Sequence, residues 1–372
     1  MKDPRQDTHP RMRPFRFAVF ALAALVVLSL GFVLIPAEKP APAEPPFPER
    51  ARAAALSEAL DLRAAAMELA SAGPADPTVL DEVVTLLTIQ ARALLSPAPE
   101  SAPASPQSSP PASSIAGPHN AAELVQALAD SGTARVKDAE TADGGMARLL
   151  AGTGTAQLLA AGRLAAAAGL PVPQGTAGWD EEGNGAAATA SACPSASAPA
   201  TAQEATGPGT PAGTRQALAG ALTAEQQAAY GYQAALPRLA PALAGPASEF
   251  LGRHKELAVA AEKRLRLACG GSVPQQPGYV LDPGFLAAPA AGLGKLETAT
   301  VAAYGDVVAV SQGQDRRWAL SALQSAAARA LRWGADPGPV PGLTLDAGKL
   351  PALPAGAGLP AGDGPTPSPA AS

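Results

Sequence analysis

Residues 214–236 read TRQALAGALTAEQQAAYGYQAAL, and this stretch governs the interpretation of the whole chain. Its larger apolar side chains recur every three or four residues, which is the period of an amphipathic helix. They are Leu218, Leu222, Ala229, Tyr232 and Leu236. Glu225 lies on the same line, in the middle of the apolar stripe. The sequence therefore predicts a helix that turns one carboxylate toward the protein interior.

Three later segments repeat this period. The second contains His254, the third contains Glu297, and the fourth runs from Arg316 to Trp333. Four amphipathic helices joined by short or Pro/Gly-rich connections are typical of an antiparallel four-helix bundle. We therefore expect a bundle over residues 214–334, within a domain bounded at 213 and 335.

Composition supports an all-α protein. Aromatic residues make up 4% of the 372 residues, and 37 glycines and 40 prolines are concentrated between the predicted helices. Strands have little support in such an alanine-rich sequence. The net charge of −5 argues against general nucleic-acid binding, so we predict no nucleic-acid partner.

The N-terminus has the features of a membrane-targeting segment. Residues 1–16 carry several basic side chains and precede an uninterrupted apolar run of 19 residues, 17–35. That run is long enough to cross a bilayer and longer than the apolar part of most secretory signals. We expect a cytoplasmic basic tail, a single-pass anchor or uncleaved signal in the cell membrane, and an extracytoplasmic remainder. A cleaved signal stays open as the alternative, because Ala41-Pro42-Ala43 resembles a processing site.

The chain between the anchor and the predicted bundle alternates helical and low-complexity segments. We expect a Pro-rich spacer at 36–50, a helical hairpin at 51–96 that packs against a helical region at 119–171, disordered linkers at 97–118 and 172–212, and a disordered tail at 336–372. Asp76 and Asn120 are predicted N-caps, and Gly132 is predicted to end a helix. Gly152-Thr153-Gly154-Thr155 lacks the lysine and the preceding strand of a phosphate-binding loop.

The inward polar residues can be compared with a di-iron bundle, which takes a Glu from each of two helices and Glu-x-x-His from the other two. Glu225, His254 and Glu297 fit three of these six positions, but Leu251 stands where the acid before His254 belongs. The fourth segment contains neither Glu nor His. We therefore predict no metal cofactor; iron or manganese on Glu225, His254 and Glu297 is the alternative.

A buried polar network is the interpretation that we favour for these residues. An unpaired carboxylate in an apolar core is costly, so each acid needs a partner. The expected acids and histidine are Glu225, Glu297 and His254, and the expected partners are Arg316 or Arg329 together with Tyr230, Tyr232 or Tyr304.

A family resemblance follows from the same positions. They are Glu225, Tyr230-Gly231-Tyr232, His254, Tyr279, Leu296-Glu297, Arg316 or Arg317, and Arg332-Trp333. In this order they resemble an uncharacterised ferritin-like domain family of mainly high-GC Gram-positive bacteria, over residues 214–334. The resemblance implies a ferritin-like bundle in an exported or membrane-bound protein and brings no assigned activity. The metal ligands of true ferritins do not match, so iron chemistry is not carried over.

The two cysteines, Cys193 and Cys269, can form a disulfide outside the cytoplasm. A disulfide and two free thiols both stay open, because Cys193 lies in low-complexity sequence. Two cysteines this far apart make no metal motif.

These observations lead to two functional hypotheses. The first is a membrane-anchored binding or structural module of the cell envelope, with an envelope protein or a small ligand as its unidentified partner and with no catalytic residues. The second is a metal-dependent oxidoreductase with a reduced ferritin-like site. No serine or cysteine has the sequence context of a hydrolase nucleophile.

Overall fold

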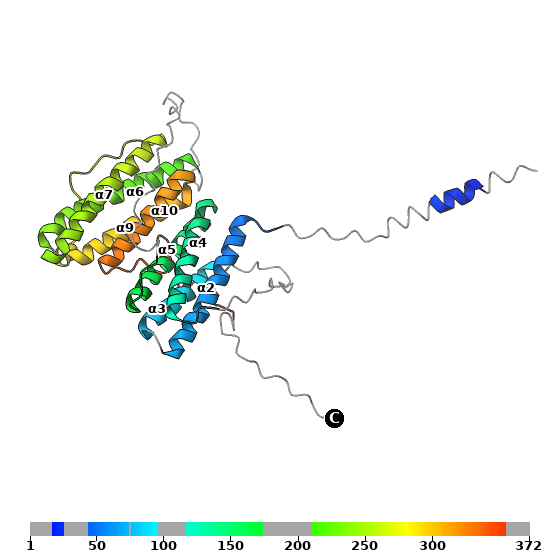
Figure 1. Cartoon of the computed structure of the whole chain (residues 1–372). Coiled ribbons are helices and arrows are strands. Elements are labelled where there is room, and N and C mark those ends of the chain that lie inside the picture. Colours follow the sequence, from blue (N-terminus) through cyan, green and yellow to red (C-terminus); the bar gives the residue numbers. More distant parts are fainter. Residues whose placement is uncertain (1–16, 26–43, 74–75, 96–116, 174–209, 355–372) are drawn as a thin grey trace, which may run out of the picture. The chain divides into compact units, whose positions relative to one another are not determined.

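A computed structural model describes residues 17–25, 44–73, 76–95, 117–173 and 210–354. Within these ranges the regular structure is helical and there is no strand, which confirms the all-α class. The chain divides into two compact units, Met1–Pro45 and Pro46–Ser372. The helices of the second unit are drawn in Figure 1.

In the first unit the structure describes a helix at residues 17–25 and the non-helical residues 44–45. The large side chains of this helix are exposed, with Phe17, Phe20 and Leu22 at 75%, 69% and 70%. The predicted anchor continues through residues 26–35, which lie outside the described residues. Among the helices that the structure describes, none combines the length and the apolar character that crossing a bilayer requires.

The N-terminal helical group of the second unit consists of α2 (Phe47–Ala72), α3 (Pro77–Leu94), α4 (Ala121–Thr141) and α5 (Gly144–Ala167). Asp76 caps α3 by accepting a bond from the backbone N–H of Thr78, at 2.9 Å. Asn120 likewise accepts from the N–H of Glu123 and caps α4. Both caps were predicted, because short polar side chains satisfy N–H groups that the first turn leaves free.

Gly132 does not end a helix, contrary to expectation. It lies inside α4, and its carbonyl oxygen faces Gly154 of α5 so closely that a Cβ at Gly154 would be 2.5 Å from it. Gly154 therefore allows α5 to pack closely on α4, and Gly152 allows Val340 and Pro341 to approach α5. Both glycines lie in the middle of α5, which is buried over most of its length. The sequence alone does not distinguish a helix-ending glycine from one at a helix contact.

The C-terminal helical group consists of α6 (Pro211–Ala235), a 3₁₀ turn (Leu236–Arg238), α7 (Pro241–Leu267), the short α8 (Pro283–Ala287), α9 (Pro289–Val310) and α10 (Gly313–Arg332). α6 packs against α7 and α9, and α10 packs against α9. Pro237 and Pro241 lie at the junction of α6 and α7, where proline ends one helix and starts the next.

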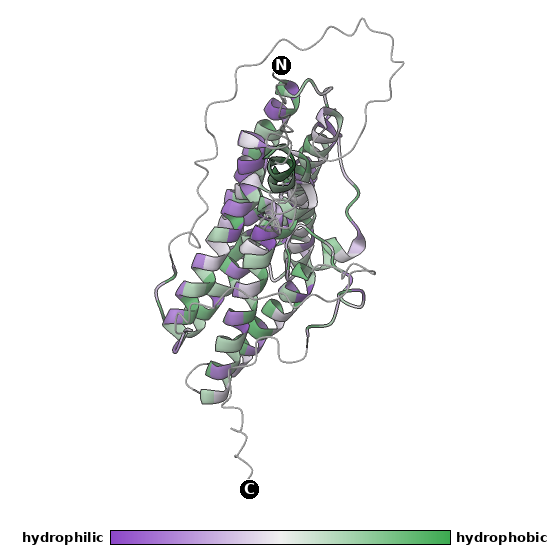
Figure 2. Ribbon diagram, turned by 90° about the vertical axis from the view of Figure 1, so that its right-hand side faces the viewer, coloured by the Kyte–Doolittle hydropathy of each residue, from purple (hydrophilic) through white to green (hydrophobic). Residues whose placement is uncertain are grey.

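The two helical groups share one hydrophobic core. Side chains from α2, α4 and α5 meet those from α6, α7, α9 and α10 in a single buried cluster, and α5 packs directly on α9. Figure 2 shows apolar and polar residues alternating around the helices of this assembly, as expected where each helix has a buried stripe. A second cluster lies within α2–α5, and a third surrounds Tyr232.

The expectation that the chain is disordered from residue 336 onward is wrong for residues 336–354. These residues form part of a C-terminal strap (residues 335–354) that lacks helix but packs on the protein, with Val340 1% exposed. Polar side chains bind its carbonyls: Gln90 binds Pro339, Arg148 binds Gly342, and Arg92 binds Ala347, Leu350 and Pro351. Composition indicates whether a segment can bury apolar surface by itself. The strap is instead held by contacts with helices from earlier in the chain, which its own composition does not reveal.

Candidate functional site: a buried ion-pair network

The C-terminal helical group brings four ionisable side chains together, one from each long helix. Glu225 comes from α6, His254 from α7, Glu297 from α9 and Arg329 from α10. The first three have 0% exposure and Arg329 has 4%. All four lie on the apolar face of their helix, where the helical period places them.

His254 lies between the two carboxylates. Its Nδ1 is 2.6 Å from Oε2 of Glu225, and its Nε2 is 3.0 Å from Oε1 of Glu297. Burial alone lowers the pKa of His254, but the charges of the two glutamates and their hydrogen bonds outweigh it and raise this pKa to about 9. The imidazole is therefore a cation at neutral pH, and both of its N–H groups donate to carboxylates.

Arg329 provides the second positive charge. Its Nε donates to Oε2 of Glu297 at 2.9 Å, and its Nη1 donates to Oγ of Ser325, one turn earlier, at 2.8 Å. Burial raises the pKa of Glu297, but Arg329 and His254 outweigh it and lower this pKa to about 2. The positive charges of Arg329 and His254 therefore both face Glu297.

Two tyrosines complete the shell of the carboxylates. The hydroxyl of Tyr304 donates to Oε1 of Glu225 at 2.6 Å, and that of Tyr232 donates to Oε1 of Glu297 at 2.6 Å. The indole N–H of Trp333 donates in turn to the hydroxyl of Tyr232. Burial first, and then the adjacent glutamate, raises the pKa of both tyrosines. Every carboxylate oxygen of Glu225 and Glu297 therefore accepts at least one hydrogen bond.

Two of the residues expected in the network lie elsewhere. Arg316 donates to the backbone carbonyls of Ala139, Glu140 and Ala142, where it holds the end of α4. Burial lowers the pKa of Arg316. Tyr230 packs edge to face with Tyr279 at a centroid distance of 5.7 Å. Residues 230 and 232 point to different sides of α6 because successive helical positions are about 100° apart.

Two residues of the network were not anticipated as members. Thr300 lies one turn after Glu297, and its hydroxyl is 3.4 Å from Oε2 of that acid and 2.8 Å from its carbonyl oxygen. Trp333 lies one turn after Arg329. The spacing of three or four residues from an inward charged residue was the available signal in both cases.

The residues present do not fit a pair of metal ions. Leu251 occupies the place of a ligand, and α10 contributes the cation Arg329 where a metal site needs an anionic or neutral donor. Both nitrogens of His254 already contact carboxylate oxygens. Across the described ranges, no cluster of three or more His, Cys, Asp or Glu side chains has the arrangement of a metal site.

Cys269 lies outside this network. It follows α7 with φ of 59°, the left-handed conformation common just after a helix, and it is disulfide-bonded. The chain has one other cysteine, Cys193, which lies outside the described residues. The pairing of these two cysteines stays a prediction.

Comparison with known protein families gives a match in the C-terminal part of the chain. The model of a family described as "Domain of unknown function (DUF4439)" matches residues 217–345, roughly a third of the chain. This range includes every side chain of the network and the first half of the strap. No curated protein and no solved structure matches the chain.

Proposed function

We propose that the chain is a membrane-anchored, extracytoplasmic protein whose C-terminal helical group is a ferritin-like four-helix bundle without a di-metal site. In this proposal the bundle is a binding or structural module of the cell envelope. The observation that carries it is the hydrogen bonding of the two acids. Every carboxylate oxygen of Glu225 and Glu297 accepts a hydrogen bond from a cationic side chain or a hydroxyl of the chain itself.

Contacts around the C-terminal group support four-helix closure. α7, α6, α9 and α10 pack in that order, and side chains bridge the remaining side between α7 and α10. There Arg264 donates to Asp315 at 3.0 Å and stacks over the ring of Trp318 at 4.6 Å. Such a ring of neighbours is what an antiparallel four-helix bundle requires.

The network suits a structural role better than a catalytic one. Every carboxylate oxygen of Glu225 and Glu297 accepts a hydrogen bond, these bonds join all four long helices, and the members of the network are buried. A buried polar set of this kind specifies which helix faces meet, since any other register leaves a charge without a partner. We therefore assign the network to holding the four helices in one arrangement.

The membrane anchor is proposed for residues 17–35. The large apolar side chains of residues 17–25 are exposed, and a basic segment precedes them. A basic flank stays on the cytoplasmic side of an inserted helix, which would place the helical groups outside.

Metal analysis tests the missing di-metal site. The full-length chain, purified from cells grown with ample iron and manganese, should contain only substoichiometric metal. Metal bound at about one or two equivalents and lost in Glu297→Gln would overturn the proposal and favour the metal-dependent oxidoreductase.

Accessibility to protease tests the location. In intact cells or spheroplasts, a tag fused after residue 372 should be cleaved by external protease while a tag before residue 1 is protected. Protection of both tags, with release of the chain into the soluble fraction, would contradict membrane anchoring.

A further inference from the structure

One end of the C-terminal helical group is formed by two segments that are far apart in the sequence. The start of α6 lies at the end of α9, where Oγ1 of Thr214 donates to the carbonyl oxygen of Val310 at 3.0 Å. The two helices are therefore antiparallel, and the end of α6 lies beside the start of α9. Residues 236–242, which join α6 to α7, and residues 280–291, which contain α8 and begin α9, meet here and pack on the cluster around Tyr232. We call these two segments the apolar end.

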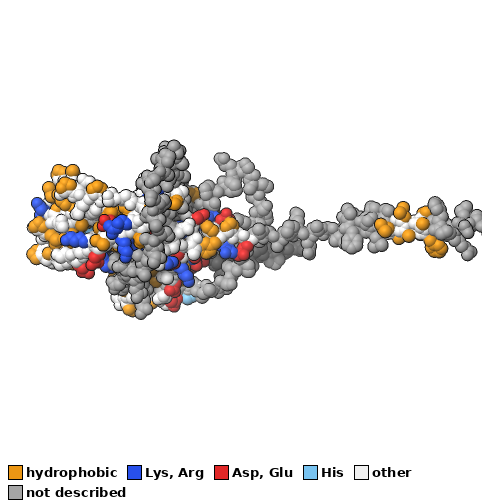
Figure 3. Space-filling model, turned by 90° about the horizontal axis from the view of Figure 1, so that it is seen from above, with side chains coloured by type: hydrophobic (Ala, Val, Ile, Leu, Met, Phe, Trp, Pro, Cys, Tyr) orange, Lys and Arg blue, Asp and Glu red, His pale blue; other side chains and the backbone are white. Residues whose placement is uncertain are grey.

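The apolar end exposes hydrophobic side chains to solvent. Leu286 on α8 is 46% exposed and Val280 is 100% exposed. Most of the other exposed residues of the two segments are proline, alanine or glycine. In Figure 3 hydrophobic side chains gather at the left of the view, the side on which α6 and α7 lie in Figure 1. A contiguous apolar surface on a folded protein commonly marks an interaction site.

The apolar end carries two charges of opposite sign. Arg238 is the charged residue of the first segment and Asp282 is that of the second, and both are exposed. Nη1 of Arg238 donates to the carbonyl oxygen of Ala234 at 2.6 Å. Oδ1 of Asp282 accepts from the N–H of Phe285 at 2.8 Å and caps α8. Each charge is therefore held at the surface, one on each segment.

A surface of this composition is complementary to a second copy of itself. In a two-fold interface, residue i of one copy contacts residue j of the other, and j contacts i. With each segment facing the other segment of the second copy, Arg238 pairs with Asp282 twice while the apolar side chains of both copies are buried. A strongly charged partner of either sign would instead find one attractive and one repulsive charge.

A lipid surface fits the apolar end less well than a second copy does. Ala51, near the start of α2, belongs to the buried cluster that contains Leu218 of α6, whereas the apolar end packs on a different cluster. The start of α2, which follows the proposed anchor, is therefore nearer the opposite end of α6. Anionic lipid headgroups would also repel Asp282, whereas a second copy supplies a cation.

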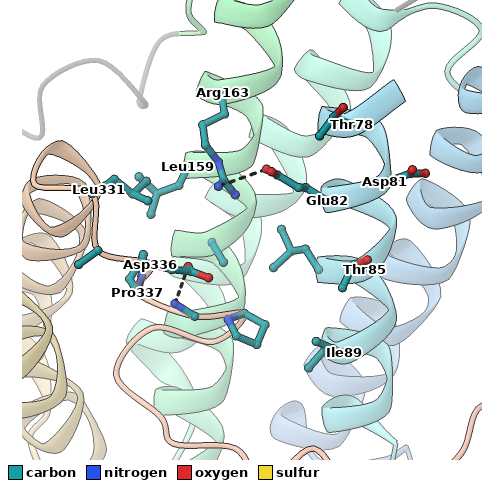
Figure 4. Close-up of a pocket in the computed structure, with 16 residues that line it drawn as sticks. Thr78, Asp81, Glu82, Thr85, Ile89, Leu159, Arg163, Leu331, Asp336 and Pro337 are labelled. Carbon is teal, nitrogen blue, oxygen red and sulfur yellow. Dashed lines mark hydrogen bonds and ion pairs between the residues drawn. The ribbon is translucent and has the colours of Figure 1, made fainter. Parts of the chain in front are cut away.

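The cleft between α3, α5 and residues 331–339, with a volume of about 720 Å³, is the rival surface (Figure 4). The one cation among its lining residues, Arg163, already faces Glu82, with Nη1 3.6 Å from Oε2. The remaining charges among the lining residues are acidic and would repel those of a second copy. The cleft therefore lacks the self-complementary charges of the apolar end.

We propose that the chain self-associates through the apolar end, as a two-fold dimer in which Arg238 of each copy faces Asp282 of the other. The dimer goes beyond the proposed function because it assigns a partner to the C-terminal helical group. It depends neither on the membrane anchor nor on the missing di-metal site, so each of the three can fail separately.

Photo-crosslinking of the full-length chain in cells tests the proposal. Benzoylphenylalanine in place of Leu286 should crosslink to a second copy and give a product of twice the chain's mass, identified by mass spectrometry. The same photoreactive residue in place of Val259, which is 64% exposed on α7, is the control and should give little dimer. A product at 286 that contains lipid or another protein instead, equal dimer from position 259, or no crosslink at 286 would overturn the proposal.

Charge substitutions locate the contact by sedimentation of the full-length chain in detergent. Leu286→Glu places like charges on both sides of the two-fold axis and removes apolar contact, so it should weaken dimerisation by roughly tenfold or more. Val259→Glu, and Thr85→Arg in the cleft, should leave dimerisation unchanged. Circular dichroism checks that the variants are folded. Loss of the dimer in Thr85→Arg but not in Leu286→Glu would assign the contact to the cleft and refute the apolar end.

A double-mutant cycle tests the ion pair itself. Arg238→Gln and Asp282→Asn each remove one charge, and asparagine is also a good N-cap, so the start of α8 is kept. Each single variant breaks both ion pairs of the dimer and should weaken it by roughly fivefold. The double variant should be little weaker than either single variant, because the same pairs are already lost. Fully additive losses would show that the two side chains do not face each other across the dimer.

Discussion

Arg329→Met is the sharpest test of the buried network. Methionine keeps the length and the helix propensity of the side chain but removes the guanidinium. Glu297, which is fully buried, then loses the donor at 2.9 Å from its Oε2 and keeps Tyr232 and His254 on its Oε1. The variant therefore leaves a buried carboxylate oxygen with Thr300 as its remaining contact, at 3.4 Å.

The expected magnitude follows from this imbalance. Removing one partner of a buried ion pair typically lowers the free energy of unfolding by about 3–5 kcal/mol. His254 still faces Glu297, so we expect the lower end, about 3 kcal/mol. For a folded unit of this size each kcal/mol lowers Tm by roughly 2–4 °C, so the melting temperature should fall by roughly 6–12 °C.

Urea unfolding of the full-length chain, followed by far-UV circular dichroism, measures the change. Arg332→Met is the matched control, because it removes an exposed arginine of the same helix and should cost less than about 1 kcal/mol. Glu297→Gln and the double variant complete a thermodynamic cycle. Removing both charges should cost less than the sum of the single changes, since the second removes an anion that the first left unpaired.

Two outcomes would refute the reasoning. One is a decrease of less than about 1 kcal/mol in the free energy of unfolding of Arg329→Met, which would mean that the ion pair is solvent-exposed. The other is strict additivity in the cycle, which would mean that Arg329 and Glu297 do not interact.

Three further predictions concern the helical core, the strap and pH. The raised pKa of His254 stabilises the folded state fully below pH 6.5, and this stabilisation is lost as the pH rises toward 9. The lowered pKa of Glu297 stabilises the folded state fully above pH 4.5, and this stabilisation is lost as the pH falls toward 2. The free energy of unfolding should therefore be highest between pH 4.5 and pH 6.5 and should fall by about 3 kcal/mol as the pH rises to 9. A free energy of unfolding that stays constant from pH 6.5 to 9 in urea titrations would contradict this. Gly154→Ala should destabilise by about 1–3 kcal/mol because its Cβ meets backbone of α4, while Gly162→Ala on the same helix has open space and should be neutral or stabilising in the same assay. Arg92→Ala removes three bonds to the strap and should raise amide hydrogen exchange in residues 343–351, with little change in α6–α10; unaltered protection there would show that the strap does not depend on Arg92.

Local rules predicted much of the secondary structure. Apolar spacing gave the helices around Glu225, His254 and Glu297, and short polar residues before proline or alanine marked the starts of α3 and α4. These features act over one or two helical turns, so they are visible in sequence. Domain boundaries that depend on packing, such as the end of the folded part after α10, were not visible in this way.

The position of two arginines shows where local reasoning stops. Arg316 and Arg329 both lie on the buried face of α10, and either could have paired with the inward acids. Arg329 reaches Glu297, while Arg316 reaches the backbone carbonyls at the end of α4. The height at which α10 packs against α9 and α4 decides this difference. Local sequence patterns are also insufficient at Gly132, whose role depends on how closely α5 packs against α4.

The sequence by itself determined that the chain is helical and that two carboxylates and one imidazole face inward, because side-chain direction follows from helical period alone. Only the tertiary structure decided that Arg329 joins them and that the strap, which has no period of its own, is held by Gln90, Arg92 and Arg148. The physical reason is that these contacts join residues far apart in the chain, so their geometry is set by how the helices pack.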